Sequence, residues 1–160
     1  MYTSYLGRND LSRGVRNNNP ANLVYTKIPW DGKIPYERNT DWSGTPTNIK
    51  KTFEQFIEIR YGIRALMRDL INDHKKGKKS VVDLISEFSP AFENNTQAYI
   101  NNVIKSIGMS VIPEMTEAIL IKLCKAIIAV ESGKDAVLIT GKDYQDAINI
   151  LGLPLKKKVT

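Results

Sequence analysis

The sequence predicts a mainly helical α+β domain of about five helices, with a small β-hairpin or sheet near the N-terminus. Apolar residues recur at spacings of three and four after residue 56, whereas short alternating runs and turn residues fill 22–56. The length of 160 residues suits a single domain with its own buried core. We therefore expect an arm at 1–12, one domain at 13–153 and a basic tail at 154–160.

Three short segments before residue 57 are predicted to be strands. Residues 23–25 form an apolar β candidate, and residues 52–56 alternate apolar and polar side chains as a half-buried strand does. Residues 34–36 are restricted to an edge, because Pro35 has no N–H to donate to a neighbouring strand. Asp31-Gly32 is a turn signal, so the segments together predict the hairpin.

Five apolar stripes at helical spacing follow these segments. The predicted helices cover about 60–74, 80–88, 95–107, 116–131 and 140–151. Ser80, Thr96 and Thr140 are placed to accept hydrogen bonds from the first turns of three of them. Gly108 and Gly152 end two helices, because glycine readily adopts the left-handed backbone found there.

The net charge of +6 lies largely in two lysine clusters, at 75–79 and 156–158. Each cluster is either solvated surface or a surface that attracts nucleic acid or the anionic polymers of a bacterial envelope. No aromatic residues interleave with the lysines, so no specific nucleic-acid partner is expected. No apolar run reaches about 18 residues and no secretory signal opens the chain, which predicts no membrane span and no signal peptide.

The chain has one cysteine and one histidine, Cys124 and His74. They leave no internal disulfide, histidine metal cluster or histidine triad to build, so no cofactor and no metal are expected. Phosphate-loop and zinc-protease motifs are also missing from the sequence. If the protein is an enzyme, its chemistry is expected to rest on carboxylates, as in glycosidic bond cleavage.

Glu131 is the carboxylate best placed for that chemistry. It ends the most apolar predicted helix and precedes Ser132-Gly133. An apolar setting and the negative end of the helix dipole both favour the protonated form, which a general acid needs. The alternative is an ordinary polar residue at a helix end.

A second feature is the polar stretch RGVRNNNPANL at residues 13–23, followed by Trp30-Asp31-Gly32. Short amide side chains compete for local backbone hydrogen bonds, so this stretch is expected to be irregular and hydrogen-bonding. It resembles the signature RGIRNNNPGNI with a following W-x-G of phage and prophage virion proteins. Those proteins are usually described as structural or cell-wall-degrading, so the resemblance implies a virion-associated protein that acts at the host cell envelope.

This resemblance covers roughly residues 13–133 and includes Tyr61-Gly62-Ile63-Arg64-Ala65 and the stretch from Glu93 to Thr96. Gly62 is expected to allow close helix packing there. Ala21 stands where the family usually has Gly, and Phe88-Ser89-Pro90 where it has Trp-Ala-Pro. The lost Trp removes one potential aromatic platform for a sugar.

Ala129-Val130-Glu131-Ser132-Gly133 resembles a motif of lysozyme-like glycosidases, including lytic transglycosylases and bacterial glucosaminidases, in which the Glu is catalytic. In the glucosaminidase type this motif precedes an Asn-containing turn, a Trp-x-Gly hairpin, an aromatic strand and a helix. Here those pieces keep their order but come before the Glu helix, which implies a circularly permuted lysozyme-like fold. Tyr99 lies in a segment that resembles one lining the sugar groove of lytic transglycosylases.

The remaining candidates extend this site. The candidate second carboxylate is Glu37, kept ionised by Arg38, or Asp41, and Glu93 is an alternative acid or else a helix-cap residue. The predicted sugar contacts are Asn19, Asn22, Trp30, Asp41 and Tyr99. Hairpin packing is the competing role for Trp30, and surface charge is the competing role for Glu37 and Asp41.

Two functions follow from these expectations. The first is a virion-associated peptidoglycan glycosidase or lytic transglycosylase with a Glu general acid, and the second is a non-catalytic structural or adaptor virion protein that binds the cell wall. Bacterial peptidoglycan and other virion proteins are the expected partners in both cases. A basic nucleic-acid-binding module is the weakest alternative.

Overall fold

Helices dominate the part of the chain that this computed structural model describes, residues 1–41, 53–88 and 96–158. The helices are α1 (Arg13–Arg16), α2 (Ile59–Lys75), α3 (Val81–Phe88), α4 (Thr96–Ile107), α5 (Glu117–Ser132) and α6 (Gly141–Asn149), with short 3-10 turns η1 (Tyr36–Arg38) and η2 (Gly133–Leu138). The mainly helical prediction is confirmed, and all five predicted helices are present. The single turn α1 was not predicted.

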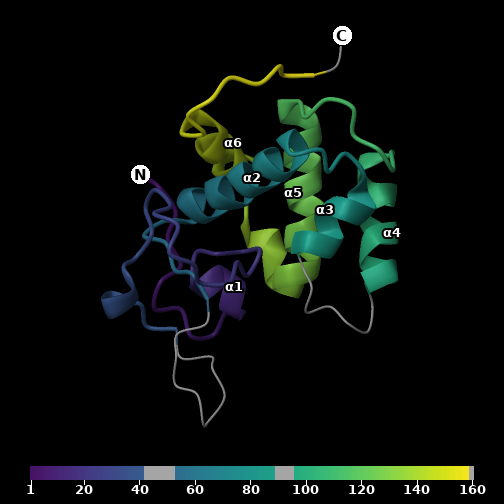
Figure 1. Cartoon of the computed structure of the whole chain (residues 1–160). Coiled ribbons are helices and arrows are strands. Elements are labelled where there is room, and N and C mark those ends of the chain that lie inside the picture. The colour runs from purple at the N-terminus through teal and green to yellow at the C-terminus, as the bar shows by residue number, and fades with distance from the viewer. Residues whose placement is uncertain (42–52, 89–95, 159–160) are drawn as a thin grey trace.

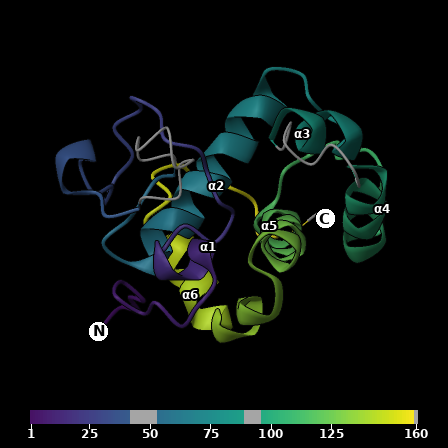
Figure 2. The same ribbon diagram turned by 90° about the horizontal axis from the view of Figure 1, so that it is seen from below.

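Helix α5 lies among the other helices, as the view along its axis shows (Figure 2). It packs against α1, α2 and α4, while α2 also contacts α3 and α6. The core residues of α5 are fully buried and apolar, as its sequence predicts: Leu120, Leu123, Cys124, Ile127 and Ile128. The C-terminal end of this helix therefore has a fixed position within the fold.

Local signals explain where α5 and α6 begin. The Thr116 side chain accepts a hydrogen bond from the main-chain N–H of Ile119 at 3.2 Å. Thr140 and Asp143 form a reciprocal capping box at the start of α6. The main-chain oxygens of Lys156 and Lys157 accept two further N–H groups of the first turn of α5, at 2.7 and 2.9 Å. The basic tail thus crosses the start of α5 (Figure 1).

The predicted β-hairpin is wrong. In the described residues before α2, strand pairing is reduced to two isolated antiparallel bridges, Val24 with Phe53 and Lys33 with Phe56. Thr52, the first residue of the predicted segment at 52–56, lies outside the described residues, as does Trp42. Residues 34–36 instead lead into η1.

Side-chain hydrogen bonds supplement the few main-chain bonds that join these segments, such as those from Glu54 to Leu23 and from Ile34 to Gln55. The Glu54 carboxylate accepts the main-chain N–H of Thr26 at 3.1 Å, and the Gln55 side-chain oxygen accepts that of Thr40 at 2.8 Å. The Asn39 side chain donates to the main-chain oxygen of Phe53 at 2.9 Å. Each bond satisfies a polar main-chain group that would otherwise pair with a neighbouring strand.

Gly62 lets α2 closely approach residues 13–23, called here the asparagine-rich segment. This confirms the packing role expected for this glycine. A Cβ atom at Gly62 would lie 1.8 Å from the main-chain oxygen of Asn18. Asn18 has a left-handed backbone, with φ of 52°, and its side chain donates to the main-chain oxygen of Phe56 at 2.9 Å. Helix α2 thus fixes the segment that reaches the end of α5.

The structure also predicts a pH dependence of stability through Asp69 in α2. Burial, and secondarily the charge of Asp73, raises the pKa of Asp69 from 3.8 to about 6. The folded protein therefore keeps a proton that the unfolded chain releases, and stability falls as the pH rises from 4 to 7. The Asp69 contribution is on the order of 2 to 3 kcal/mol. Urea unfolding at pH 4 and pH 7 should show that Asp69→Asn loses less unfolding free energy between the two pH values than the wild type does. An equal loss in both proteins would contradict this role of Asp69.

Candidate functional site

Glu131 lies in the last turn of α5, half-buried, with side chains from two other parts of the chain on its carboxylate. The Tyr99 hydroxyl donates to one carboxylate oxygen at 3.3 Å. The Asn22 side-chain nitrogen lies 3.4 Å from the other and donates to the Glu131 main-chain oxygen at 3.0 Å. Three of the predicted site residues therefore meet at one point.

The left-handed backbone of Asn22 aims its side chain at Glu131. Its φ is 52°, a conformation that asparagine tolerates better than most residues. The Arg13 guanidinium donates to the Asn22 side-chain oxygen at 3.3 Å. Arg13 also lies over the Phe53 ring, 3.8 Å from its centre, a cation–π contact that orients the guanidinium.

Ser132 joins the asparagine-rich segment to the end of α5. Its hydroxyl, in a buried side chain, donates to the main-chain oxygen of Pro20 at 2.6 Å. Gly14 leaves room for this approach, because a Cβ there would lie 2.9 Å from the Ser132 hydroxyl oxygen. The Glu-Ser-Gly motif and the asparagine-rich segment thus bond directly, although more than a hundred positions separate them.

Electrostatics keep Tyr99 a proton donor at this site. Burial, and then the nearby negative charge of Glu131, raises the pKa of Tyr99 well above its usual value. Its hydroxyl therefore stays protonated and able to donate to the carboxylate. Glu131 itself lies at the C-terminal, negative end of the α5 dipole.

The three consecutive asparagines are buried, at 2%, 0% and 0% exposure for Asn17, Asn18 and Asn19. The Asn19 amide donates to the main-chain oxygens of Leu23 and Glu54, both at 3.0 Å, and its oxygen accepts from the main-chain nitrogen of Leu23. They therefore act as a hydrogen-bonded polar core beside the apolar one. The predicted sugar contact of Asn19 stays a prediction.

Other predicted site residues lie at two separate pockets. Trp30 and Glu37 line one of about 340 Å³ together with Tyr25 and Tyr36, whose rings meet edge to face. The η1 turn that carries Glu37 lies at the left edge in both ribbon views, apart from α5 (Figures 1 and 2). Asp41 lines another pocket with Asn17. Glu93 lies outside the described residues.

One lysine of each cluster lies at a common pocket. Lys75 and Lys156 line it together with Glu114. Lys156 pairs with Glu114 at 3.4 Å. No helix among residues 1–41, 53–88 and 96–158 is both long and apolar enough to span a membrane. The same ranges hold no cluster of three or more His, Cys, Asp or Glu suited to a metal ion.

Sequence reasoning missed several residues that build the site. Arg13 donates to the Asn22 side chain, and Ser132 joins the end of α5 to Pro20. In the sequence, both residues stood out only as members of the two motifs that contain them. Glu54 is fully buried and pairs with Lys33 at 3.0 Å. Burial raises the pKa of Glu54, which the Lys33 charge partly offsets. Nothing in the alternating run around Glu54 distinguishes this residue as a buried anion.

The chain resembles a bacteriophage protein along most of its length. It is 32% identical over 128 residues to Protein P5 of Pseudoalteromonas phage PM2, covering 79% of this chain and 75% of that protein. The chain belongs to the Protein P5 family. This confirms that it is a phage protein, as its asparagine-rich signature predicts. No family model matches it.

Two substitutions of Asn22 separate its backbone from its side chain. Asn22→Ala should lower the free energy of unfolding by about 1–2 kcal/mol more than Asn22→Gly. The left-handed conformation is sterically unfavourable for alanine, whereas glycine adopts it freely. Both remove the contacts with Glu131 and Arg13. Urea unfolding of the two variants measures the difference, and equal stabilities would contradict the backbone argument.

Proposed function

We propose that this Protein P5 relative is a virion-associated peptidoglycan glycosidase with a circularly permuted lysozyme-like fold, in which Glu131 is the general acid. The meeting of Glu131 with Tyr99 and Asn22 carries the proposal. The permuted order of motifs requires the asparagine-rich segment to reach the Glu helix, and the Ser132–Pro20 bond joins these two segments. Bacterial peptidoglycan and other virion proteins are the proposed partners, and the host cell envelope is the proposed place of action.

The proposed chemistry starts with proton transfer from Glu131 to the oxygen of the glycosidic bond. The bond then breaks through an oxocarbenium-like transition state, and the Glu131 carboxylate can next take a proton from the attacking hydroxyl. Asn22 and Tyr99 fix the position of the carboxyl group during both steps. Glu37 and Asp41, the two candidate second carboxylates, line other pockets, so the proposal rests on one carboxylate. It favours attack by a hydroxyl of the sugar itself, which gives an anhydro product.

Purified protein incubated with isolated sacculi tests this function. We expect soluble muropeptides in the supernatant, with anhydro ends visible by mass spectrometry. Reducing ends would instead indicate attack by water. The second candidate, a wall-binding structural or adaptor protein, predicts sedimentation with sacculi and no released fragments. If the protein neither releases fragments nor sediments with sacculi, both functions are contradicted.

A further inference from the structure

A second site lies beside the end of α1, at the other side of the asparagine run from Asn22. It is a pocket of about 340 Å³, within the size range of small-molecule sites. The described residues that line it are polar apart from one glycine: Gly7, Asn9, Arg16, Asn17, Thr40, Asp41 and Gln55. None of these residues contacts Glu131 through a hydrogen bond described above.

The wall of this pocket is held in a fixed geometry. The Gln55 side-chain nitrogen donates to the Asn17 side-chain oxygen at 2.9 Å and to the Thr40 hydroxyl at 3.0 Å. The Gln55 oxygen accepts the main-chain N–H of Thr40 at 2.8 Å. Because Gln55 and Asn17 are nearly fully buried, these bonds fix the orientation of the Asn17 amide.

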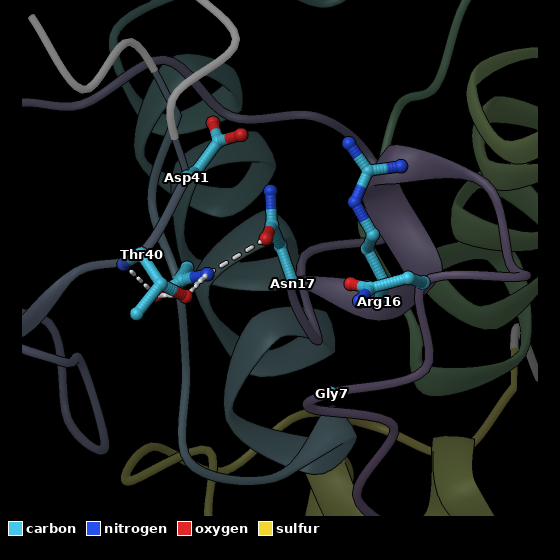
Figure 3. A pocket seen from close by; sticks show the side chains of 7 residues that line it. Gly7, Arg16, Asn17, Thr40 and Asp41 are labelled. Atoms are coloured by element: carbon cyan, nitrogen blue, oxygen red, sulfur yellow. Dashed lines mark hydrogen bonds between the residues drawn. The ribbon is translucent and has the colours of Figure 1, made fainter.

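The Asn17 side-chain nitrogen is the unusual group of this pocket. It is buried and has no hydrogen-bond partner within residues 1–41, 53–88 and 96–158, and Asn17 as a whole is 2% exposed. Figure 3 shows it pointing up between the Asp41 carboxylate and the Arg16 guanidinium. A buried donor left without a partner costs about 1–3 kcal/mol, so such groups commonly mark a function.

The charges lining the pocket indicate the chemistry of its ligand. Among the described residues that line it, Arg16 contributes one positive charge and Asp41 one negative charge, so these residues together favour neither an anion nor a cation. Asn17 and Arg16 supply donors, whereas the Asp41 carboxylate supplies only acceptors. A ligand that fits must offer acceptors and donors side by side without net charge, which is the pattern of neighbouring hydroxyl groups on a sugar ring.

We propose that this pocket binds one neutral pyranose unit of a carbohydrate. The Asn17 amide and Arg16 guanidinium donate to ring hydroxyl oxygens, and a neighbouring hydroxyl donates to Asp41. The proposal concerns binding alone and holds whether or not Glu131 cleaves a bond. One segment, residues 13–23, then supplies a ligand-binding amide at Asn17 and a positioning amide at Asn22.

The proposal is tested by titrating the full chain with N-acetylglucosamine trisaccharide and monitoring the amide chemical shifts by NMR. The protein carries Glu131→Gln throughout, so turnover does not disturb the measurement. Asn17→Asp keeps the oxygen that accepts from Gln55 and removes the unpaired donor. We expect the Kd to rise at least tenfold in this variant, with the largest shifts in the starting protein at Asn17, Thr40 and Gln55.

Asn101→Asp is the matched control, because the Asn101 oxygen likewise accepts from a glutamine, Gln97, at 2.9 Å, but at an exposed position of α4. It should leave the Kd unchanged. Arg16→Gln provides a second test if Asn17→Asp fails to fold, and it should also weaken binding at least tenfold. The proposal is overturned if the trisaccharide does not saturate the shifts at these residues, if both variants bind as tightly as the control, or if acetate saturates the same shifts.

Discussion

Gly62→Ala is expected to lower the free energy of unfolding by about 3 kcal/mol or more. Glycine in a helix interior normally costs about 0.5–1 kcal/mol relative to alanine, so this substitution would stabilise an open helix. Here the added methyl group would lie 1.8 Å from the main-chain oxygen of Asn18. The backbone of the asparagine-rich segment would have to move away from α2, and urea unfolding measures the cost.

Gly141→Ala is the matched control for this prediction. Gly141 begins α6, and no atom lies within 4 Å of the position its Cβ would take. We expect Gly141→Ala to leave stability unchanged or slightly raised, since alanine is the better helix former. If Gly62→Ala proves as stable as Gly141→Ala, the close packing of α2 on Asn18 does not hold the segment in place.

Glu131→Gln is expected to lower the rate of muropeptide release by about 100- to 10,000-fold, the usual contribution of a positioned general acid. The amide has the shape of the protonated acid and an oxygen that can accept from Tyr99 or Asn22. It cannot transfer a carboxylic proton. We therefore expect unchanged sedimentation with sacculi and a thermal midpoint within a few degrees of the wild type.

Tyr99→Phe should give a smaller loss of rate, because it removes one donor to the carboxylate and leaves the acid itself. The expected loss is about tenfold, equal to roughly 1.4 kcal/mol of transition-state stabilisation. A loss as large as that of Glu131→Gln would move the acid role towards Tyr99. Initial rates of muropeptide release under identical conditions make the comparison.

The long helices could be predicted from the sequence because their signals are local. The apolar spacing of α5 and the capping box of Thr140 and Asp143 act over a few residues, and the structure keeps both. The hairpin prediction failed because its decisive bonds are not local. Glu54 and Gln55 satisfy the main chain of Thr26 and Thr40, which alternation of apolar residues cannot reveal.

The asparagine-rich segment shows the same limit. Its polarity predicted an irregular, hydrogen-bonding stretch, and this is confirmed by the bonds of Asn18 and Asn19 to distant main-chain atoms. Its burial could not be predicted, because the Asn18 and Asn19 amides donate to main-chain oxygens from another part of the chain. The segment thus forms a polar core that positions Asn22 at Glu131.

Resemblance of short motifs predicted that Glu131, Asn22 and Tyr99 share a site, and the structure places them in contact. The predicted hairpin would have brought Glu37 to that site as well, but the structure places Glu37 at a separate pocket. The strands are reduced to single bridges, and the η1 turn lines a pocket at the edge of the molecule together with Trp30. The order of the motifs along the sequence could not predict this position of Glu37.

The role of Glu131 in cleaving glycan strands can be tested by comparing three proteins. Wild type, Glu131→Gln and Glu114→Gln are incubated with the same sacculi, and soluble muropeptides are quantified over time. Glu114 is a matched control, because it lies before the opposite end of α5 and pairs only with the exposed Lys156 among the described ion pairs. We expect wild type and Glu114→Gln to release equal amounts of muropeptides and Glu131→Gln to release almost none. Equal release by all three, or no release by the wild type, would contradict it.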